Sequence, residues 1–187
     1  PERQEQVGDA LDQLALKDLA ARVVEIPLVI GGKEVRTAAT ADVALPHNHR
    51  HVLARVHQAG PEEVGAAVAA ARDAWREWST WTLERRAQVF LKAADLLATT
   101  HRPIVNAATM LGQSKTAHQA EIDAACELID FLRFNVHFAS RVYLEQPFSP
   151  SGTRNTMDYR PLEGFVYAIT PFNFTSIGGN LPTAPAV

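Results

Sequence analysis

A single asparagine, Asn173, stands between two phenylalanines in the stretch TPFNF, directly after an apolar run rich in β-branched and aromatic residues. That run, residues 165–169, predicts a buried strand, and Pro171 ends its ladder pairing. Ligands bind at the carboxyl ends of strands in α/β sheets, so the Asn173 amide could donate a hydrogen bond to a carbonyl oxygen on which negative charge develops. Such a donor typically lowers the activation free energy by about 2.7–4 kcal/mol. The alternative is a local cap, in which this asparagine bonds to the backbone of the helix that follows.

Three acidic residues, Asp123, Glu127 and Asp130, share one face of a predicted helix because their spacing is i, i+4 and i+7. Solvation on an outer helix is one interpretation of Asp123 and Asp130, and a role in a functional site is the other. Glu127 is nearest to Phe131 and Phe134, so it is the one expected to be buried and to need a cationic partner. That partner is either an arginine or an ammonium group on a ligand.

Other residues with reactive side chains have simpler interpretations. His47, His49 and His51 alternate and would share one face of a strand, but no carboxylate or cysteine nearby completes a site, so no metal is expected. Cys126, the one cysteine, falls in mid-helix with no base or helix N-terminus to activate it, and is expected to be a small core residue. The stretch IGGN, residues 177–180, lacks the spacing of a phosphate-binding loop.

The extended elements are predicted from alternation and turn residues. Residues 9–21 have helical spacing, and residues 26–36 predict two short strands around a pair of glycines. Residues 43–59 predict a second extended stretch, which becomes a half-exposed strand. A segment rich in Pro, Ser, Thr, Asn and Gly, residues 144–164, predicts strands and turns that form a flap leaving the main body.

The helices are predicted from caps and apolar periodicity. They are expected to begin at Pro61, after the cap Thr82 and at Pro103, with the last of these ending near Gly112. Residues 116–143 form the longest periodic segment and are apolar on most of the helix circumference. This pattern predicts a helix that is buried on several sides.

Composition excludes some classes of partner. The chain has 187 residues, 47% of them hydrophobic and 21% charged, and a net charge of −3. Its 18 Lys and Arg are scattered, so nucleic acid is not an expected partner, and no apolar run approaches the roughly 20 residues that cross a bilayer. Residues 1–14 resemble neither a signal peptide nor a transit peptide, which favours a cytoplasmic location. The chain starts without Met and stops on the apolar stretch NLPTAPAV, which indicates a fragment.

The segment ITPFNFTSIGGNLPTAPA, with EIDAACELIDFLRFNVHFA some fifty residues earlier and IGGKEV near the start, resembles the aldehyde dehydrogenase superfamily. Within it, the chain is similar to the L-glutamate γ-semialdehyde (1-pyrroline-5-carboxylate) dehydrogenases. General aldehyde dehydrogenases usually carry Trp where this chain has Phe172 and Pro where it has Thr175. The resemblance implies an α/β fold, the truncated N-terminal part of the aldehyde dehydrogenase fold: a Rossmann-like NAD-binding domain with a helical layer and the start of an oligomerisation flap. The expected division is an N-terminal helix and hairpin, the helical part of the NAD-binding domain, flap strands, and the first sheet strand with the start of the next helix, over residues 1–45, 46–144, 145–160 and 161–187.

The resemblance also implies roles for single residues. Asn173 looks like the oxyanion-hole donor that stabilises a thiohemiacetal, formed when a cysteine outside this chain attacks the aldehyde. Phe174 resembles the aromatic wall against the substrate's aliphatic chain. Glu127 matches a carboxylate that lines the substrate pocket in this subfamily, which fits a substrate with an α-ammonium group.

The cofactor and the reaction follow from the same resemblance. Thr170, Pro171 and Phe172 are similar to the strand end that meets the nicotinamide ribose of NAD. The complete enzyme would oxidise L-glutamate γ-semialdehyde to L-glutamate in proline degradation, and this fragment alone would be inactive. Residues 145–160, with unpaired edges, would be covered by a second subunit, so a homo-oligomer is expected. The alternatives are an aldehyde dehydrogenase of different substrate and a non-catalytic binding or assembly module.

Overall fold

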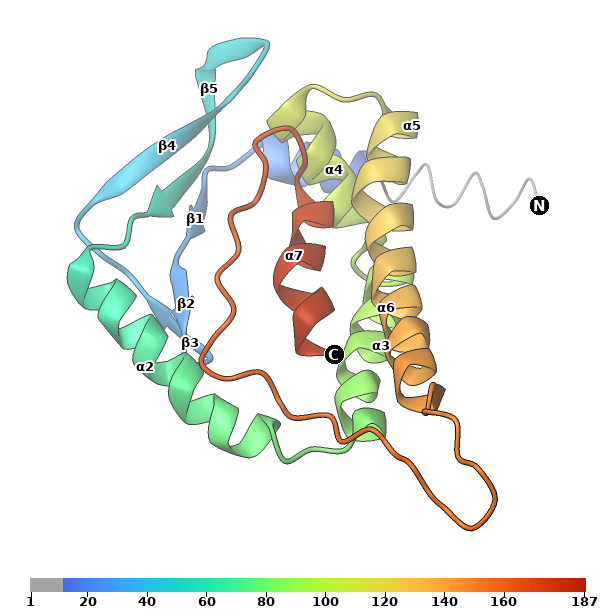
Figure 1. Ribbon diagram of the computed structural model, residues 1–187. Helices are drawn as coiled ribbons and strands as arrows, with labels where there is room; N and C mark the ends of the chain where they lie inside the picture. Colours follow the sequence, from blue (N-terminus) through green and yellow to red (C-terminus); the bar gives the residue numbers. More distant parts are fainter. Residues whose placement is uncertain (1–11) are drawn as a thin grey trace.

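The computed structural model describes residues 12–187, in which two small sheets stand opposite a layer of helices (Figure 1). Strands β2 (Leu28–Ile30) and β3 (Lys33–Val35) form the expected antiparallel hairpin. Its turn places Gly31 and Gly32 at φ 57° and 75°, a backbone conformation that side chains other than glycine's rarely adopt. The hairpin predicted within residues 26–36 is therefore confirmed.

The second sheet has the strand order β1-β5-β4. Strand β4 (Thr40–Leu45) pairs antiparallel with β5 (Asn48–His57), and β1 (Val24–Ile26) pairs parallel with β5. The single extended stretch predicted over residues 43–59 is wrong, because the chain reverses in a two-residue turn at Pro46 and His47. Alternation on both sides of so short a turn looks like one continuous strand.

A helix over residues 12–20 and α4 (Arg102–Gln113) cover this sheet. The helix predicted over residues 9–21 is confirmed where it is described, and residues 9–11 lie outside the described part of the chain. A small apolar core joins these elements: Leu45, Leu53, Ala54 and Leu111 are buried, with Leu16, Leu19, Ala20 and Val24 packed against them. The N-terminal helix is thus held to the sheet and to α4 by apolar contacts.

The two helices predicted after the sheet begin where expected. In α2 (Pro61–Trp78), Pro61 is at the first position and the Glu63 carboxylate accepts a hydrogen bond of 2.8 Å from the Gly60 N–H. In α3 (Leu83–Ala98), the Thr82 hydroxyl accepts from the backbone N–H of Arg85, a normal N-cap. None of the α2 residues is buried within residues 12–187, so this helix packs on one side only.

The long helix predicted over residues 116–143 is confirmed, with an irregularity in its first half. It consists of α5 (Ala117–Ala120), the π-helical turn η1 (Glu121–Cys126) and α6 (Glu127–Leu144). Burial on several sides is wrong, because Phe134 and Phe138 are 52% and 58% exposed. The described chain places neighbours along only one side of this helix.

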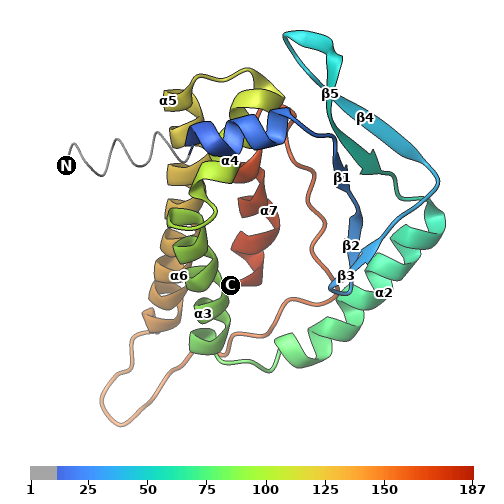
Figure 2. The ribbon, with the colours of Figure 1, turned by 180° about the vertical axis from the view of Figure 1, so that it is seen from behind.

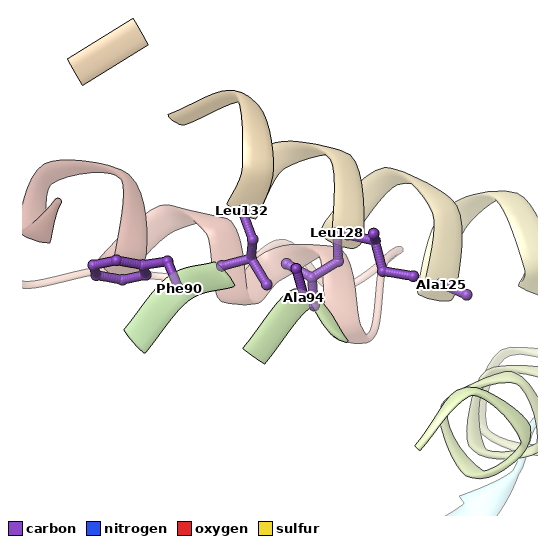
Figure 3. Packing of buried hydrophobic residues seen from close by; sticks show 6 residues of the cluster. Phe90, Ala94, Ala125, Leu128 and Leu132 are labelled. Atoms are coloured by element: carbon purple, nitrogen blue, oxygen red, sulfur yellow. The ribbon is translucent and has the colours of Figure 1, made fainter. Parts of the chain in front are cut away.

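The main core lies between α3 and α6 (Figure 3). Phe90 and Ala94 of α3 meet Ala125, Leu128 and Leu132 of the long helix, and all five are at most 7% exposed. The alanines allow close approach of the helices, while the leucines fill the space between their turns. This pairing fixes the position of the long helix, which carries Glu127.

The remaining chain crosses the open side of the helical layer. Residues 145–160 extend past the ends of α3 and α6, and the following segment runs back between the two layers (Figures 1 and 2). It ends in the short helices η2 (Ser176–Gly179), α7 (Asn180–Thr183) and η3 (Ala184–Ala186).

The strands predicted in this part of the chain do not form. Residues 145–175 contain no strand, and Tyr167 and Ile169 are 78% and 73% exposed. Both the flap strands at 145–160 and the buried strand at 165–169 are therefore wrong for this structure. A strand is stable only when a neighbour satisfies its N–H and C=O groups, and none of the five described strands pairs with this segment.

Candidate active site

Asn173 lies on an exposed turn at the end of the extended segment. Its side-chain amide makes no hydrogen bond within residues 12–187, and the following turn, η2, has no side-chain cap. The local cap that was the alternative interpretation is therefore not formed in the described chain. The Asn173 side-chain amide is therefore available to a ligand, while the backbone carbonyl of the same residue accepts a hydrogen bond.

Side chains from α4 and the loop after it hold the backbone of this turn. The Gln113 side chain donates to the Phe172 carbonyl over 3.2 Å, and the Lys115 ammonium donates to the Asn173 carbonyl over 3.1 Å. The hydroxyls of Thr109 and Thr175 also bond to each other. Three points of the segment 172–175 are thus held by side chains of α4 and of the loop after it, which restricts where Asn173 can point.

Lys115 is the central residue of this support. Its ammonium pairs with the Asp123 carboxylate and lies 4.6 Å from the centroid of the Phe174 ring. Only 18% of the Lys115 side chain and 20% of the Asp123 side chain are exposed. Asp123 is therefore not the solvated acid that its helical position suggested. The sequence carries no signal for Lys115, because its partners on the turn are 58 and 59 residues away.

The π-helical turn also contacts this segment. The Glu127 N–H bonds to the Ile122 carbonyl, five residues earlier, and the Ser176 hydroxyl donates to the Ala124 carbonyl over 2.5 Å. Single π-helical turns occur frequently at functional sites. Here the irregularity provides a backbone acceptor that anchors the start of η2.

The predicted cofactor residues lie just before the turn. Thr170 and Pro171 are exposed, and Phe172 is 98% exposed. Thr170 packs against Gly178, where an added Cβ would lie 3.0 Å from the Thr170 Cγ2. Thr170 therefore lies against η2, the first of the short helices at the end of the chain. The Phe172 ring is almost fully exposed within residues 12–187.

Glu127 is half-buried and has no ion pair or hydrogen bond from its carboxylate within residues 12–187. It lies one helical turn beyond Asp123, the acid that pairs with Lys115. Of the two partners expected for Glu127, an arginine does not pair with it within residues 12–187. An exposed aromatic, Phe131, follows on the same face and is 40% exposed.

Cys126 is not the core residue predicted from its position. Its sulfur lies 3.5 Å from the Arg102 guanidinium and 3.6 Å from the Glu121 carboxylate, which pair with each other. Asn106, almost fully buried, donates to the same carboxylate over 2.7 Å. The cysteine therefore borders a polar cluster behind the long helix.

The histidines predicted to share a face sit at the tip of the β4–β5 hairpin. The His47 ring bonds to the Ser114 hydroxyl over 2.7 Å. Among the described residues, no group of three His, Cys, Asp or Glu is arranged to hold a metal ion. Two surface hollows, at residues 46–50 and between α2 and residues 163–164, do not include Asn173.

A family model of the aldehyde dehydrogenase family matches residues 34–187, most of the chain. The chain belongs to the aldehyde dehydrogenase family. It is 53% identical over 179 residues to a mitochondrial delta-1-pyrroline-5-carboxylate dehydrogenase of Bos taurus, and 50% identical to the one of Homo sapiens. Each match covers 96% of this chain and 32% of that protein. The chain thus spans about a third of the length of the curated relatives it matches.

Solved structures of related dehydrogenases match all or nearly all of this chain. A delta-pyrroline-5-carboxylate dehydrogenase from Mycobacterium tuberculosis, crystallised with NAD, is 52% identical, with a TM-score of 0.90 over 100% of this chain and 34% of that one. A 1-pyrroline-5-carboxylate dehydrogenase from Thermus with bound NAD is 28% identical, with a TM-score of 0.85 over 95% of this chain and 35% of that one. The α/β aldehyde dehydrogenase fold and the subfamily resemblance predicted from the sequence are confirmed.

The same comparisons correct one prediction. The cytoplasmic location is wrong, because the similar enzymes of Bos taurus, Dictyostelium discoideum and Homo sapiens are named mitochondrial. That prediction depended on the composition of residues 1–14. In a chain that spans about a third of the length of its relatives, these residues carry no information about a leader. No helix among the described residues is long and apolar enough to span a membrane.

Proposed function

We propose that this chain is part of an aldehyde dehydrogenase that oxidises L-glutamate γ-semialdehyde, derived from 1-pyrroline-5-carboxylate, to L-glutamate with NAD. The observation that carries the proposal is the Asn173 amide, which is exposed and without a partner in the described chain, on a turn held by Gln113 and Lys115. The 50–53% identity to relatives named for this substrate supports its choice.

Asn173 acts as a donor to the oxyanion. When a thiolate supplied from outside this chain adds to the aldehyde carbon, the carbonyl oxygen gains negative charge. A fixed N–H donor lowers the energy of that state without reorganisation, because its position is set before the reaction. The backbone bonds from Gln113 and Lys115 provide this fixed position.

Glu127 and Phe174 select the substrate. A half-buried carboxylate without a cationic partner in the described chain binds an ammonium group favourably, since the pair replaces lost hydration. L-glutamate γ-semialdehyde carries an α-ammonium, whereas simple aldehydes do not. The Phe174 ring, held against Lys115, then packs against the methylene groups of the substrate.

Residues 170–172 fit a role in holding NAD. No backbone–backbone hydrogen bond is formed by residues 165–172 in the described chain, so the peptide groups of Thr170 are available to a ligand. The absence of a side chain at Gly178 keeps Thr170 close to the turn. NAD, when bound, supplies the hydride acceptor. The residues of this chain hold its ribose at Thr170, Pro171 and Phe172, on the segment that leads directly to Asn173.

Residues 145–160 mediate assembly in this proposal. They extend away from the helical layer and leave Phe148 84% exposed (Figure 1). Extended backbone that pairs with no strand, together with an exposed aromatic side chain, favours pairing with a second subunit. The complete enzyme is therefore a homo-oligomer, and light scattering at micromolar concentration should give a mass above that of one subunit.

A chimera tests the catalytic proposal. Residues 1–187 would replace the matching third of the Mycobacterium tuberculosis enzyme, to which they are 52% identical. The chimera should form NADH from 1-pyrroline-5-carboxylate and much less from propanal. A chimera that binds NAD but forms no NADH from either would contradict an enzymatic role. Equal efficiency with both substrates would instead favour an aldehyde dehydrogenase of different specificity.

A further inference from the structure

We infer that Lys115 is a positioning residue for the reaction, and that it acts through the backbone of Asn173. The inference rests on the proposed function, because it deepens the account of the same site. In this inference, Lys115 does not contact the substrate. It fixes the position of Asn173, which does.

The geometry around the Lys115 ammonium supports this role. The ammonium donates to the Asn173 carbonyl over 3.1 Å, pairs with the Asp123 carboxylate, and lies 4.6 Å from the Phe174 ring centroid. One cation thus joins the long helix to the proposed oxyanion donor and to the proposed substrate wall. No other side chain within residues 12–187 contacts both Asn173 and Phe174 through a polar or cation–π interaction.

Burial of the ion pair between Lys115 and Asp123 makes the loss of either charge costly. Both side chains are about four-fifths buried, so losing either partner leaves an uncompensated charge of low exposure. Loss of the Lys115 ammonium therefore releases the Asn173 carbonyl, and the unpaired Asp123 carboxylate then repels that carbonyl oxygen. Gln113 still holds the Phe172 carbonyl, one residue earlier, so the turn shifts rather than unfolds.

A kinetic double-mutant cycle in the chimera tests the inference. Lys115→Met, which keeps the aliphatic stem and loses the cation, should lower kcat about 10- to 100-fold, the scale expected for a misplaced catalytic group. The KM for NAD should stay within about twofold, and Lys115→Arg should recover part of kcat. In an Asn173→Ala background, Lys115→Met should cause little further loss, because it acts through Asn173. Lys92→Met, an exposed lysine on α3, is the matched control and should leave kcat unchanged.

A second measurement needs no activity. The Asn173 resonances can be assigned in this chain by selective ¹⁵N-asparagine labelling and their loss in Asn173→Ala. Lys115→Met should shift or broaden the backbone and side-chain signals of Asn173, and Lys92→Met should not. Asp123→Asn, which removes the charge but keeps the shape, should produce a smaller shift of the same signals.

The outcomes separate the inference from the proposed function. A chimera without activity while Lys115→Met still shifts the Asn173 signals would contradict the function and leave the positioning role supported. An active chimera in which Lys115→Met lowers kcat equally with and without Asn173 would overturn the inference. Unchanged Asn173 signals in Lys115→Met would overturn it as well.

Discussion

Replacement of Gly178 by alanine should displace Thr170 and weaken NAD binding. A Cβ at Gly178 would lie 3.0 Å from the Thr170 Cγ2 and 3.1 Å from its Cβ, whereas ordinary contacts begin at 3.4 Å. The neighbour must therefore move by about 0.4 Å, the difference between 3.4 and 3.0 Å. Overpacking typically costs about 1–3 kcal/mol.

The lower end of that range is expected here, because Thr170 is exposed and its segment forms no backbone–backbone hydrogen bonds in the described chain. The segment yields, and most of the cost appears when a ligand requires the original position of Thr170. A loss of about 1 kcal/mol corresponds to about a fivefold rise in Kd. Isothermal titration of the chimera with NAD measures this rise, and urea unfolding should show a change in stability of about 1 kcal/mol or less.

Gly179→Ala is the matched control for this prediction. Its Cβ would meet the methyl groups of Leu128 at 3.9 Å, an ordinary contact, and its φ of −61° suits alanine. NAD affinity should not change in this variant. Equal Kd values for Gly178→Ala and Gly179→Ala would refute the argument that Thr170 and Gly178 form part of the cofactor site.

Two further variants address the core and substrate selection. Leu132 is 3% exposed between α3 and α6, so Leu132→Ala should lower the free energy of unfolding, measured by urea denaturation, by about 2–5 kcal/mol. Val89 is 47% exposed, so Val89→Ala should change that free energy by less than about 0.5 kcal/mol. Glu127→Gln should raise the KM for L-glutamate γ-semialdehyde by about 10- to 100-fold, the effect of losing a charged hydrogen bond of about 1.5–3 kcal/mol. Oxidation of propanal should be unaffected by Glu127→Gln, and an equal loss for both aldehydes would argue against an ammonium partner.

Local signals predicted the local elements of this fold. The glycine pair at 31–32, the proline at position 61 and the cap at Thr82 each fix a backbone conformation within a few residues, and the structure has a turn or helix start at each. The helical period over residues 116–143 was also sufficient, because a helix satisfies its own backbone hydrogen bonds.

Elements that depend on distant partners were not predictable in the same way. β1 is three residues long and exists because it pairs with β5, about thirty residues later. Residues 165–169 have the composition of a buried strand, yet the described chain offers them no neighbouring strand, and most of them remain exposed. Composition describes what a segment prefers, and pairing decides whether it forms.

The candidate site shows the same division. Asn173 could be singled out because an amide between two phenylalanines after an apolar run is unusual on local grounds. Lys115 could not, since nothing near it in sequence indicates that it meets Asp123 and a turn 58 residues away. Solvation of Asp123 was a wrong interpretation because its partner, Lys115, lies outside the helix that carries the acid.

The central claim is that the Asn173 amide stabilises an oxyanion, and the kcat of Asn173→Ala in the chimera tests it most directly. Loss of one such donor typically lowers kcat by about 10²–10³, so a fall of that size is predicted, with the Kd for NAD unchanged. A kcat within about threefold of the parent chimera, at saturating 1-pyrroline-5-carboxylate and NAD, would contradict the account.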